Sequence, residues 1–227
     1  HMSDGLVNGP TTVVFGALAI AAVALCAWKA RAELDERTVP LAGLVAAFIF
    51  AVQMINFPIL PGVSGHLLGG ALAAILVGPY TGVLCIAIVL VVQSLLFADG
   101  GVTALGMNIT NMALIGVAAG YATAVALYAL VRRRRLDRSV GVMGVVGFLS
   151  ALVGTVSASM GFVVEYAIGG AAQTSLGTVA AYMLGTHVLI GIGEGLITAV
   201  TVMAVVRSRP DLVYLLRRSR TETAVAA

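Results

Sequence analysis

The chain has 227 residues, of which 60% are hydrophobic and only 10% charged, and its mean hydropathy is +1.05. An ordinary soluble domain is about a quarter charged, so this composition excludes a soluble globular fold and favours a membrane protein. The net charge of +3 comes from thirteen Lys and Arg residues that gather in short stretches, which argues against a nucleic-acid-binding face.

Seven apolar runs follow one another along the chain, at residues 11–28, 39–57, 67–78, 81–97, 104–131, 140–164 and 176–206. Five of them are long enough for the roughly 20-residue span of a hydrocarbon core, and 81–97 is borderline. The short run 67–78 is either a span extended by its neighbours or a re-entrant segment. The first run has no basic segment before it, so we expect a retained helix and not a cleaved signal peptide.

Three basic clusters flank the ends of these runs, at Lys29–Arg37, Arg132–Arg138 and Arg207–Arg220. The positive-inside rule places all three in the cytoplasm. An even number of crossings must then separate the first two clusters, and that number is four only if 67–78 spans. We therefore predict an all-α integral membrane protein. It is a bundle of seven transmembrane helices with its N-terminus outside and its C-terminus cytoplasmic.

We expect one transmembrane domain over residues 1–227, with residues 1–10 outside the membrane and residues 207–227 as a cytoplasmic tail. The topology predicts outer loops at 58–66, 98–102 and 165–175, and an inner turn near 78–81. Three Gly-x-x-x-Gly pairs suit close helix packing, at Gly65/Gly69, Gly116/Gly120 and Gly191/Gly195. The two cysteines lie in apolar runs and are interpreted as small buried side chains, Cys26 and Cys85.

Histidines are the strongest candidates for chemistry. The predicted topology places His1 and His66 outside and His187 in the outer half of the last helix. His1-Met2 is either a cloning remnant or part of a chelate. A terminal amine, a deprotonated amide and an imidazole form fused rings, and four nitrogens in a plane suit Ni(II) or Cu(II). A methionine before His1 would supply the amine. His66 is then either incidental or the fourth nitrogen donor.

The other polar residues are candidates for supporting such a site. His187 either orients a ligand or is a satisfied intramembrane histidine. Asp4 and Asp99 are the expected acceptors for the second N–H of a metal-bound histidine. Glu194 is the deep ionisable group, which is costly in a membrane and therefore a functional candidate. Further outer candidates are Asn108, Asn111 and Glu165.

Nucleotide chemistry is not expected in this chain. A phosphate-binding loop needs a lysine after its glycines, and Lys29, in Ala27-Trp28-Lys29, is the only lysine. We therefore expect no enzyme activity, and any ATP hydrolysis must belong to separate subunits.

Four segments resemble one known family. His1-Met2-Ser3-Asp4-Gly5 is similar to the initial Met-His-x-x-Asp-Gly of CbiM/NikM proteins, the substrate-binding components of energy-coupling factor transporters for cobalt and nickel. The other similar segments occur in the family's order, at Ser64–Gly70, Gln93–Asn108 and His187–Glu194. Together they cover nearly the whole chain. The missing Met before His1 leaves the amine donor open, but Asp4-Gly5 has the family spacing and argues against a cloning remnant.

The resemblance implies a seven-helix bundle that binds Ni(II) or Co(II) as its transported substrate, with His1 and His66 as metal ligands. Supporting residues would be Asp4, Ser64, Asp99, Asn108, His187 and Glu194. Implied partners are a transmembrane coupling subunit, ATPase subunits and a small accessory membrane subunit. The motifs Ser64-Gly65-His66-Leu67 and Phe97-Ala98-Asp99-Gly100 resemble nickel members more than cobalt members. The alternatives are cobalt uptake for cobalamin biosynthesis, a vitamin-binding component, or a scaffold subunit that binds no metal.

Overall fold

Long helices dominate the computed structural model, which describes residues 1–136 and 139–217. Within this part, five helices are long and apolar enough to cross a membrane. They are α1 (Gly9–Ala30), α4 (Pro79–Leu96), the continuous helix α5–η1–α6 (Leu105–Asn108, Ile109–Gly116 and Val117–Arg133), α7 (Val140–Gly169) and α8 (Leu176–Ser208). A short 3-10 turn, η2 (Pro210–Leu212), follows α8. The prediction of a mostly helical membrane protein is confirmed.

Two of the apolar runs form shorter helices. The prediction of a span over 39–57 is wrong at its end, because α2 (Thr38–Gln53) stops after 16 residues. Phe57 precedes Pro58, and a residue before proline is pushed into extended backbone. The chain there enters strand β1 (Phe57–Leu60), which pairs antiparallel with β2 (Val63–Gly65). The predicted outer loop at 58–66 is therefore mostly a β-hairpin.

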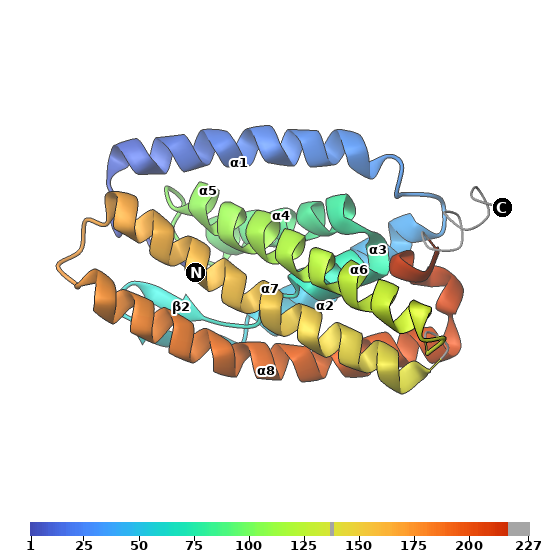
Figure 1. Ribbon diagram of the computed structural model, residues 1–227. Helices are drawn as coiled ribbons and strands as arrows, with labels where there is room; N and C mark the ends of the chain where they lie inside the picture. Colours follow the sequence, from blue (N-terminus) through green and yellow to red (C-terminus); the bar gives the residue numbers. More distant parts are fainter. Residues whose placement is uncertain (137–138, 218–227) are drawn as a thin grey trace.

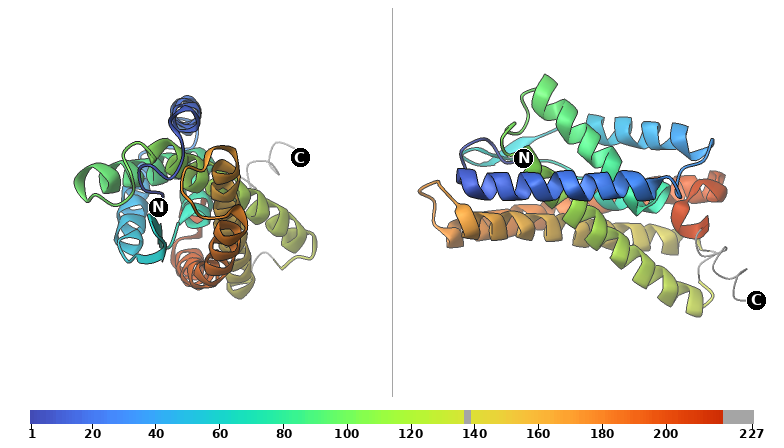
Figure 2. Two further views of the ribbon diagram at one scale, coloured as in Figure 1. Left: turned by 90° about the vertical axis from the view of Figure 1, so that its left-hand side faces the viewer. Right: turned by 90° about the horizontal axis from the view of Figure 1, so that it is seen from above.

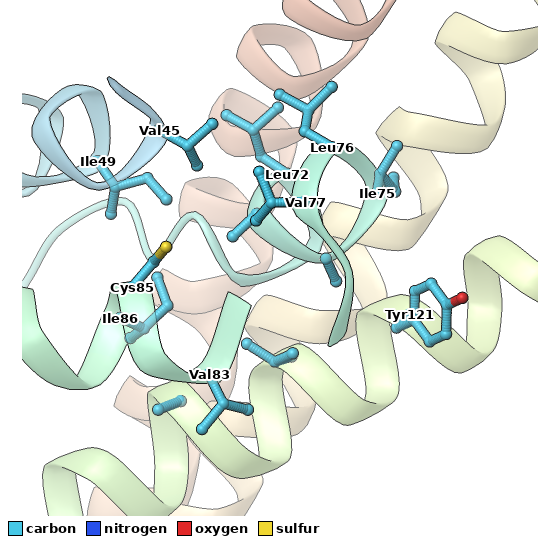
Figure 3. Close-up of a cluster of buried hydrophobic side chains, with 14 of the residues drawn as sticks. Val45, Ile49, Leu72, Ile75, Leu76, Val77, Val83, Cys85, Ile86 and Tyr121 are labelled. Carbon is cyan, nitrogen blue, oxygen red and sulfur yellow. The ribbon is translucent and has the colours of Figure 1, made fainter. Parts of the chain in front are cut away.

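Helix α3 (Gly70–Val77) lies at the centre of the protein. Its eight residues are all buried, and at 1.5 Å per residue it is about 12 Å long, too short to cross a bilayer alone. Figure 3 shows its side chains among those of α2, α4 and α6, including Ile49, Ile86 and Tyr121. Irregular backbone at membrane depth is tolerated where protein surrounds it, so this core allows the segment before α3 to stay non-helical.

Two of the three predicted glycine pairs lie in close helix contacts. A Cβ on Gly154 of α7 would lie 2.8 Å from the carbonyl oxygen of Gly116, and one on Gly120 would lie 2.8 Å from the Cβ of Ala71. Gly191 and Gly195 of α8 likewise face side chains of α7. The third pair is not helical: Gly65 lies in β2, and Gly69 has a φ of +81° before α3.

Two further details differ from the sequence predictions. The fifth apolar run contains the π-helical segment η1, which the sequence pattern did not indicate. The predicted outer loop 165–175 begins too early, because apolar residues carry α7 on to the Gly169-Gly170 pair. Glu165 is consequently a buried helical residue, and its Oε2 accepts a hydrogen bond from Asn111 Nδ2 at 2.6 Å.

The basic clusters gather at one end of the bundle. Figures 1 and 2 show that α1, α6 and α8 end there and that α7 begins there. The hairpin and the connection between α7 and α8 lie toward the opposite end. The N-terminus is placed among the helices instead of at either end, and the side chain of Met2 is fully buried. Residues 137–138 and 218–220 of the basic clusters fall outside the described part.

Candidate metal centre

The first three residues run as an extended segment between the hairpin and the loop at 98–102. Met2 forms an antiparallel bridge with Val63 of β2. Backbone N–H groups on both sides complete the contact, with distances of 2.9–3.0 Å: Ser3 N to Gly62 O, Ser64 N to His1 O, and Gly101 N to Met2 O. The N-terminal segment thus pairs with the two-stranded hairpin through an isolated β-bridge and is buried inside the protein.

Asn108 of α5 fixes this segment from a third side. Its Oδ1 accepts a hydrogen bond from Met2 N at 2.8 Å, and its Nδ2 donates to Met2 O at 3.1 Å. Both backbone groups of Met2 are therefore hydrogen-bonded. Asn108, which the sequence places in the outer half of the fifth helix, therefore contacts the N-terminal segment through the backbone of Met2.

The backbone nitrogen of His1 meets Ser64 and His66. It donates to Ser64 O at 2.6 Å and to Ser64 Oγ at 3.2 Å, and it lies 3.3 Å from His66 Nε2. The two imidazole rings are stacked with centroids 4.1 Å apart and an interplanar angle of 30°. Three of the predicted site residues therefore come together around one backbone nitrogen.

Asp99 orients the ring of His1. Its Oδ1 lies 3.0 Å from His1 Nδ1, and its Oδ2 accepts from Asn56 Nδ2 at 2.8 Å. Partial burial raises the pKa of Asp99, but the interactions with His1 and Asn56 outweigh it and bring the pKa below its usual value. Asp99 is thus ionised at neutral pH. Within the described part, Nε2 of His1 is buried and has no hydrogen-bond partner.

His66 presents a lone pair to His1. Its Nδ1 lies 2.8 Å from the carbonyl oxygen of Leu67, which fixes Nδ1 as the protonated nitrogen and leaves Nε2 as the acceptor. Complete burial and the nearby His1 lower the pKa of His66 well below its ordinary value, although the Leu67 carbonyl opposes them in part. His66 is therefore a neutral imidazole, which is the form that binds metals.

Glu194 holds the loop that carries His66. The carboxylate accepts from Leu68 N at 2.8 Å, from Gly69 N at 2.9 Å and from Thr155 Oγ1 at 2.9 Å. Gln53 of α2 donates to Leu68 O at 2.7 Å. The loop is thus tied to α2, α7 and α8, and the functional role of Glu194 stays a prediction.

His187 lines the same small cavity as His1 and His66. Its Nδ1 lies 2.8 Å from Met183 O, one turn earlier in α8. Asp4, by contrast, is not beside a histidine. Its Oδ1 accepts from Thr103 N at 2.8 Å and from Thr103 Oγ1 at 2.6 Å, because the segment leaves the cavity after Met2. Asp4 therefore secures the N-terminal segment to the loop at 98–103.

Hydrogen bonds from Thr103 lower the pKa of Asp4 although burial acts in the opposite direction. Two amides that contact the site, Gln53 and Asn56, were not among the predicted candidates. A sequence signal exists for them, because each interrupts an otherwise apolar stretch. Their partners could not be read from the chain, because those partners lie far away in sequence.

The arrangement suits a metal only if backbone nitrogen takes part. In the described part of the chain, no three His, Cys, Asp or Glu side chains are placed to hold one ion. Two nitrogens that are each about 2 Å from a metal lie at most about 4 Å apart. The 3.3 Å between the His1 nitrogen and His66 Nε2 meets this condition.

The chain is also similar in sequence to known transport proteins. The chain is 39% identical over 217 residues to a putative fused nickel transport protein NikMN of Archaeoglobus fulgidus, covering 94% of this chain and 68% of that protein. It is 33% identical to the fused nickel transport protein NikMN of Rhodobacter capsulatus, covering 93% of this chain and 63% of that protein.

The fold is also similar to a solved structure, described as the crystal structure of a transition metal transporter. The TM-score is 0.76 at 26% identity, and the match covers 91% of this chain and 92% of that one. With its apolar helices and these relatives, the chain is a multi-pass protein of the prokaryotic cell membrane. A family model described as the cobalt uptake substrate-specific transmembrane region matches residues 1–212, so the chain belongs to the CbiM family.

Proposed function

We propose that this protein captures Ni(II) or Co(II) at the outer face of the membrane, for uptake driven by partner subunits. The observation that carries the proposal is the approach of the His1 nitrogen to within 3.3 Å of the neutral His66 Nε2. The CbiM family and the nickel transport relatives support a metal substrate over the alternatives of a scaffold or a vitamin-binding component.

In this proposal, His1 and His66 hold the ion through nitrogen. The donors are the backbone nitrogen of His1, its imidazole and Nε2 of His66. Because Asp99 lies 3.0 Å from Nδ1 of His1, a chelate through the backbone nitrogen and Nδ1 of His1 must displace that contact. A methionine before His1 would turn its nitrogen into an amide and add a fourth donor. A planar set of nitrogens suits Ni(II).

The seven-crossing topology belongs to the same proposal. Helix α2 and the segment made of residues 67–69 and α3 would supply two crossings in addition to the five long helices. With the basic clusters in the cytoplasm, residues 1–10 and the hairpin lie outside, and residues 207–227 form the cytoplasmic tail. The gathering of the described basic residues at one end of the bundle supports this orientation.

Transport requires energy that we assign to other subunits. The chain has no lysine after a glycine-rich loop, so separate ATPase subunits would hydrolyse ATP and a transmembrane coupling subunit would transmit the energy. A small accessory membrane subunit would be a further partner. We favour nickel as the substrate, because nickel transport proteins are among the relatives. Cobalt uptake for cobalamin biosynthesis is the alternative that the family description supports.

A nickel titration of the purified full chain tests the proposal. We expect His66→Ala to abolish high-affinity binding, because it removes a metal ligand. The control is Leu67→Ala, which changes the neighbouring side chain but keeps the carbonyl that fixes His66. Unchanged affinity and stoichiometry in His66→Ala would show that the site is elsewhere. Competition between nickel and cobalt on the unmodified N-terminus identifies the preferred substrate.

A further inference from the structure

A groove runs between α1 and α4 on the surface of the bundle. Figure 2 shows α1 at the edge of the protein, and the groove is lined mainly by residues 16–27 of α1 and residues 84–92 of α4. Four of the six lining residues on α1 are glycine or alanine, whose small side chains leave space beside α4. Larger apolar side chains in the groove stay uncovered, since Ile20 and Ile88 are 75% and 61% exposed.

Contacts between α1 and the rest of the bundle close the groove at both ends. At one end, α1 and α5 meet backbone to backbone, because a Cβ on Gly106 would lie 2.5 Å from the Cα of Gly16. At the other end, the carboxylate of Glu33 accepts hydrogen bonds from Tyr80 N at 3.2 Å and from Thr81 N at 2.7 Å. A membrane-spanning helix of a partner is continuous across the bilayer, so it cannot lie along a groove that is closed in this way.

The length of the groove matches one leaflet of a bilayer. Residues 16 and 27 are eleven positions apart in α1, which corresponds to about 16 Å at a rise of 1.5 Å per residue. The hydrocarbon core of a bilayer is about 30 Å thick, so each leaflet contributes about 15 Å. A single acyl chain, which ends near the middle of the bilayer, therefore has the right length for the groove.

A positive charge lies just beyond one end of the groove. Lys29 follows the last groove residue of α1, and its Nζ lies 5.5 Å from the ring centre of Tyr80 on α4 and 5.9 Å from that of Trp28. Among the residues that the structure describes, no carboxylate forms an ion pair with Lys29. Aromatic rings with a lysine are typical of the membrane interface, and basic groups between helices on the cytoplasmic side bind anionic lipid headgroups.

We propose that the groove between α1 and α4 binds one anionic phospholipid, with an acyl chain along the groove and its phosphate beside Lys29. Lipid tails are as apolar as the groove, so the chain is held by packing into the space that the small residues of α1 leave. The charge of Lys29 selects the headgroup. Such a lipid would fasten α1 to α4, and its binding does not depend on the metal site.

Trp28 provides the measurement, because it is the only tryptophan of the chain and lies beside Lys29. The purified full chain is placed in phosphatidylcholine vesicles with a minor fraction of a brominated lipid, which quenches tryptophan fluorescence on contact. The brominated lipid is phosphatidylglycerol in one series and phosphatidylcholine in the other. We expect phosphatidylglycerol to be preferred beside Trp28 by about fivefold, the effect of one basic residue on an anionic lipid. Lys29→Gln should remove the preference.

Ala24→Phe tests the apolar part of the site, because the new ring fills the groove. The matched control is Ala21→Phe, the same substitution on the same helix at an exposed residue that does not line the groove. We expect Ala24→Phe to lose the preference and Ala21→Phe to keep it, and Ala24→Leu replaces Ala24→Phe if that variant unfolds. Equal quenching by the two brominated lipids in the original chain would overturn the proposal. A preference that survives Lys29→Gln or the groove-filling variant would overturn it too.

Discussion

Nε2 of His66 lies 3.3 Å from the backbone nitrogen of His1, although 65 positions separate the two residues in sequence. The contact depends on two buried segments: the N-terminus forms a β-bridge with Val63 of β2, and the His66 loop is bound inside the bundle by Glu194 and Gln53. A site built in this way is sensitive both to the groups that hold His1 and to those that hold His66.

The substitution Asp99→Asn tests the contact between Asp99 and the imidazole of His1. The carboxylate lies 3.0 Å from His1 Nδ1, and the amide keeps its size but loses the charge. In the proposed chelate, Nδ1 exchanges Asp99 for the metal, so the carboxylate acts through its negative charge beside the cation, and we expect its loss to weaken nickel binding by about tenfold. Titration of the purified chain measures this. Asp211→Asn is the control, since Asp211 pairs with Arg209 on the exposed surface. Equal affinities for both variants would contradict the role of Asp99.

The neutral state of His66 predicts how stability depends on pH in the absence of metal. The folded pKa of His66 lies well below that of the unfolded chain, so acid protonates the unfolded state first. Stability is therefore present above the ordinary histidine pKa of about 6.5 and falls as the pH drops below it, by up to about 1.4 kcal/mol per pH unit.

Thermal unfolding in detergent, with a chelator present, measures this effect between about pH 7.5 and pH 5.5, a range that brackets the ordinary pKa. We expect His66→Gln to flatten the dependence, because glutamine does not titrate. A variant that loses stability with acid as steeply as the original chain would show that other groups cause the loss.

The sequence predicted the broad architecture because composition and charge act over whole segments. Apolar runs located the helices, and basic clusters predicted which helix ends lie together, as Figure 1 shows. The predicted ends of two helices were wrong where a local signal competed with the apolar pattern. Pro58 ended the second run early, and the apolar residues after Glu165 extended α7 beyond the predicted loop.

The histidines of the candidate site could be named from the sequence, but the residues that contact them could not. The structure brings His1 and His66 together, and their role as metal ligands stays a prediction. Asp4 and Asp99 were equal candidates for the partner of a histidine, because sequence gives no direction for a side chain. The bond of Gln53 to Leu68 likewise depends on a fold that brings α2 beside the loop.

The substitution Glu194→Gln tests the hydrogen bonds that position the loop carrying His66. The carboxylate accepts from three donors, and one oxygen would become an NH2 group facing a backbone N–H. Leaving a buried donor unsatisfied costs about 1–3 kcal/mol, so we expect a loss of unfolding free energy of this size together with weaker nickel binding. Thr155→Val removes only one donor and should lose less of both. Unaltered nickel affinity in Glu194→Gln would disconnect Glu194 from the site.

Asn108→Ala tests the insertion of the N-terminus. It removes the partner of the Met2 N–H and one of the two donors to Met2 O, which keeps its hydrogen bond from Gly101 N, and it touches no proposed ligand. Since an unsatisfied buried N–H costs about 1–3 kcal/mol, we expect the segment to leave its position in a larger fraction of molecules. Nickel affinity should then fall, and an aminopeptidase should remove His1 faster than from the original chain.

The matched control is Asn8→Ala, which loses the cap of α1 but leaves the contacts of Met2 in place. Asn8→Ala should keep the resistance of His1 to the aminopeptidase. Because bound metal would engage the His1 nitrogen, added nickel should slow cleavage of the original chain and protect Asn108→Ala much less. Equal protection of both chains by nickel would show that Asn108 does not position the N-terminal ligand, and that contacts such as the bridge to Val63 are sufficient.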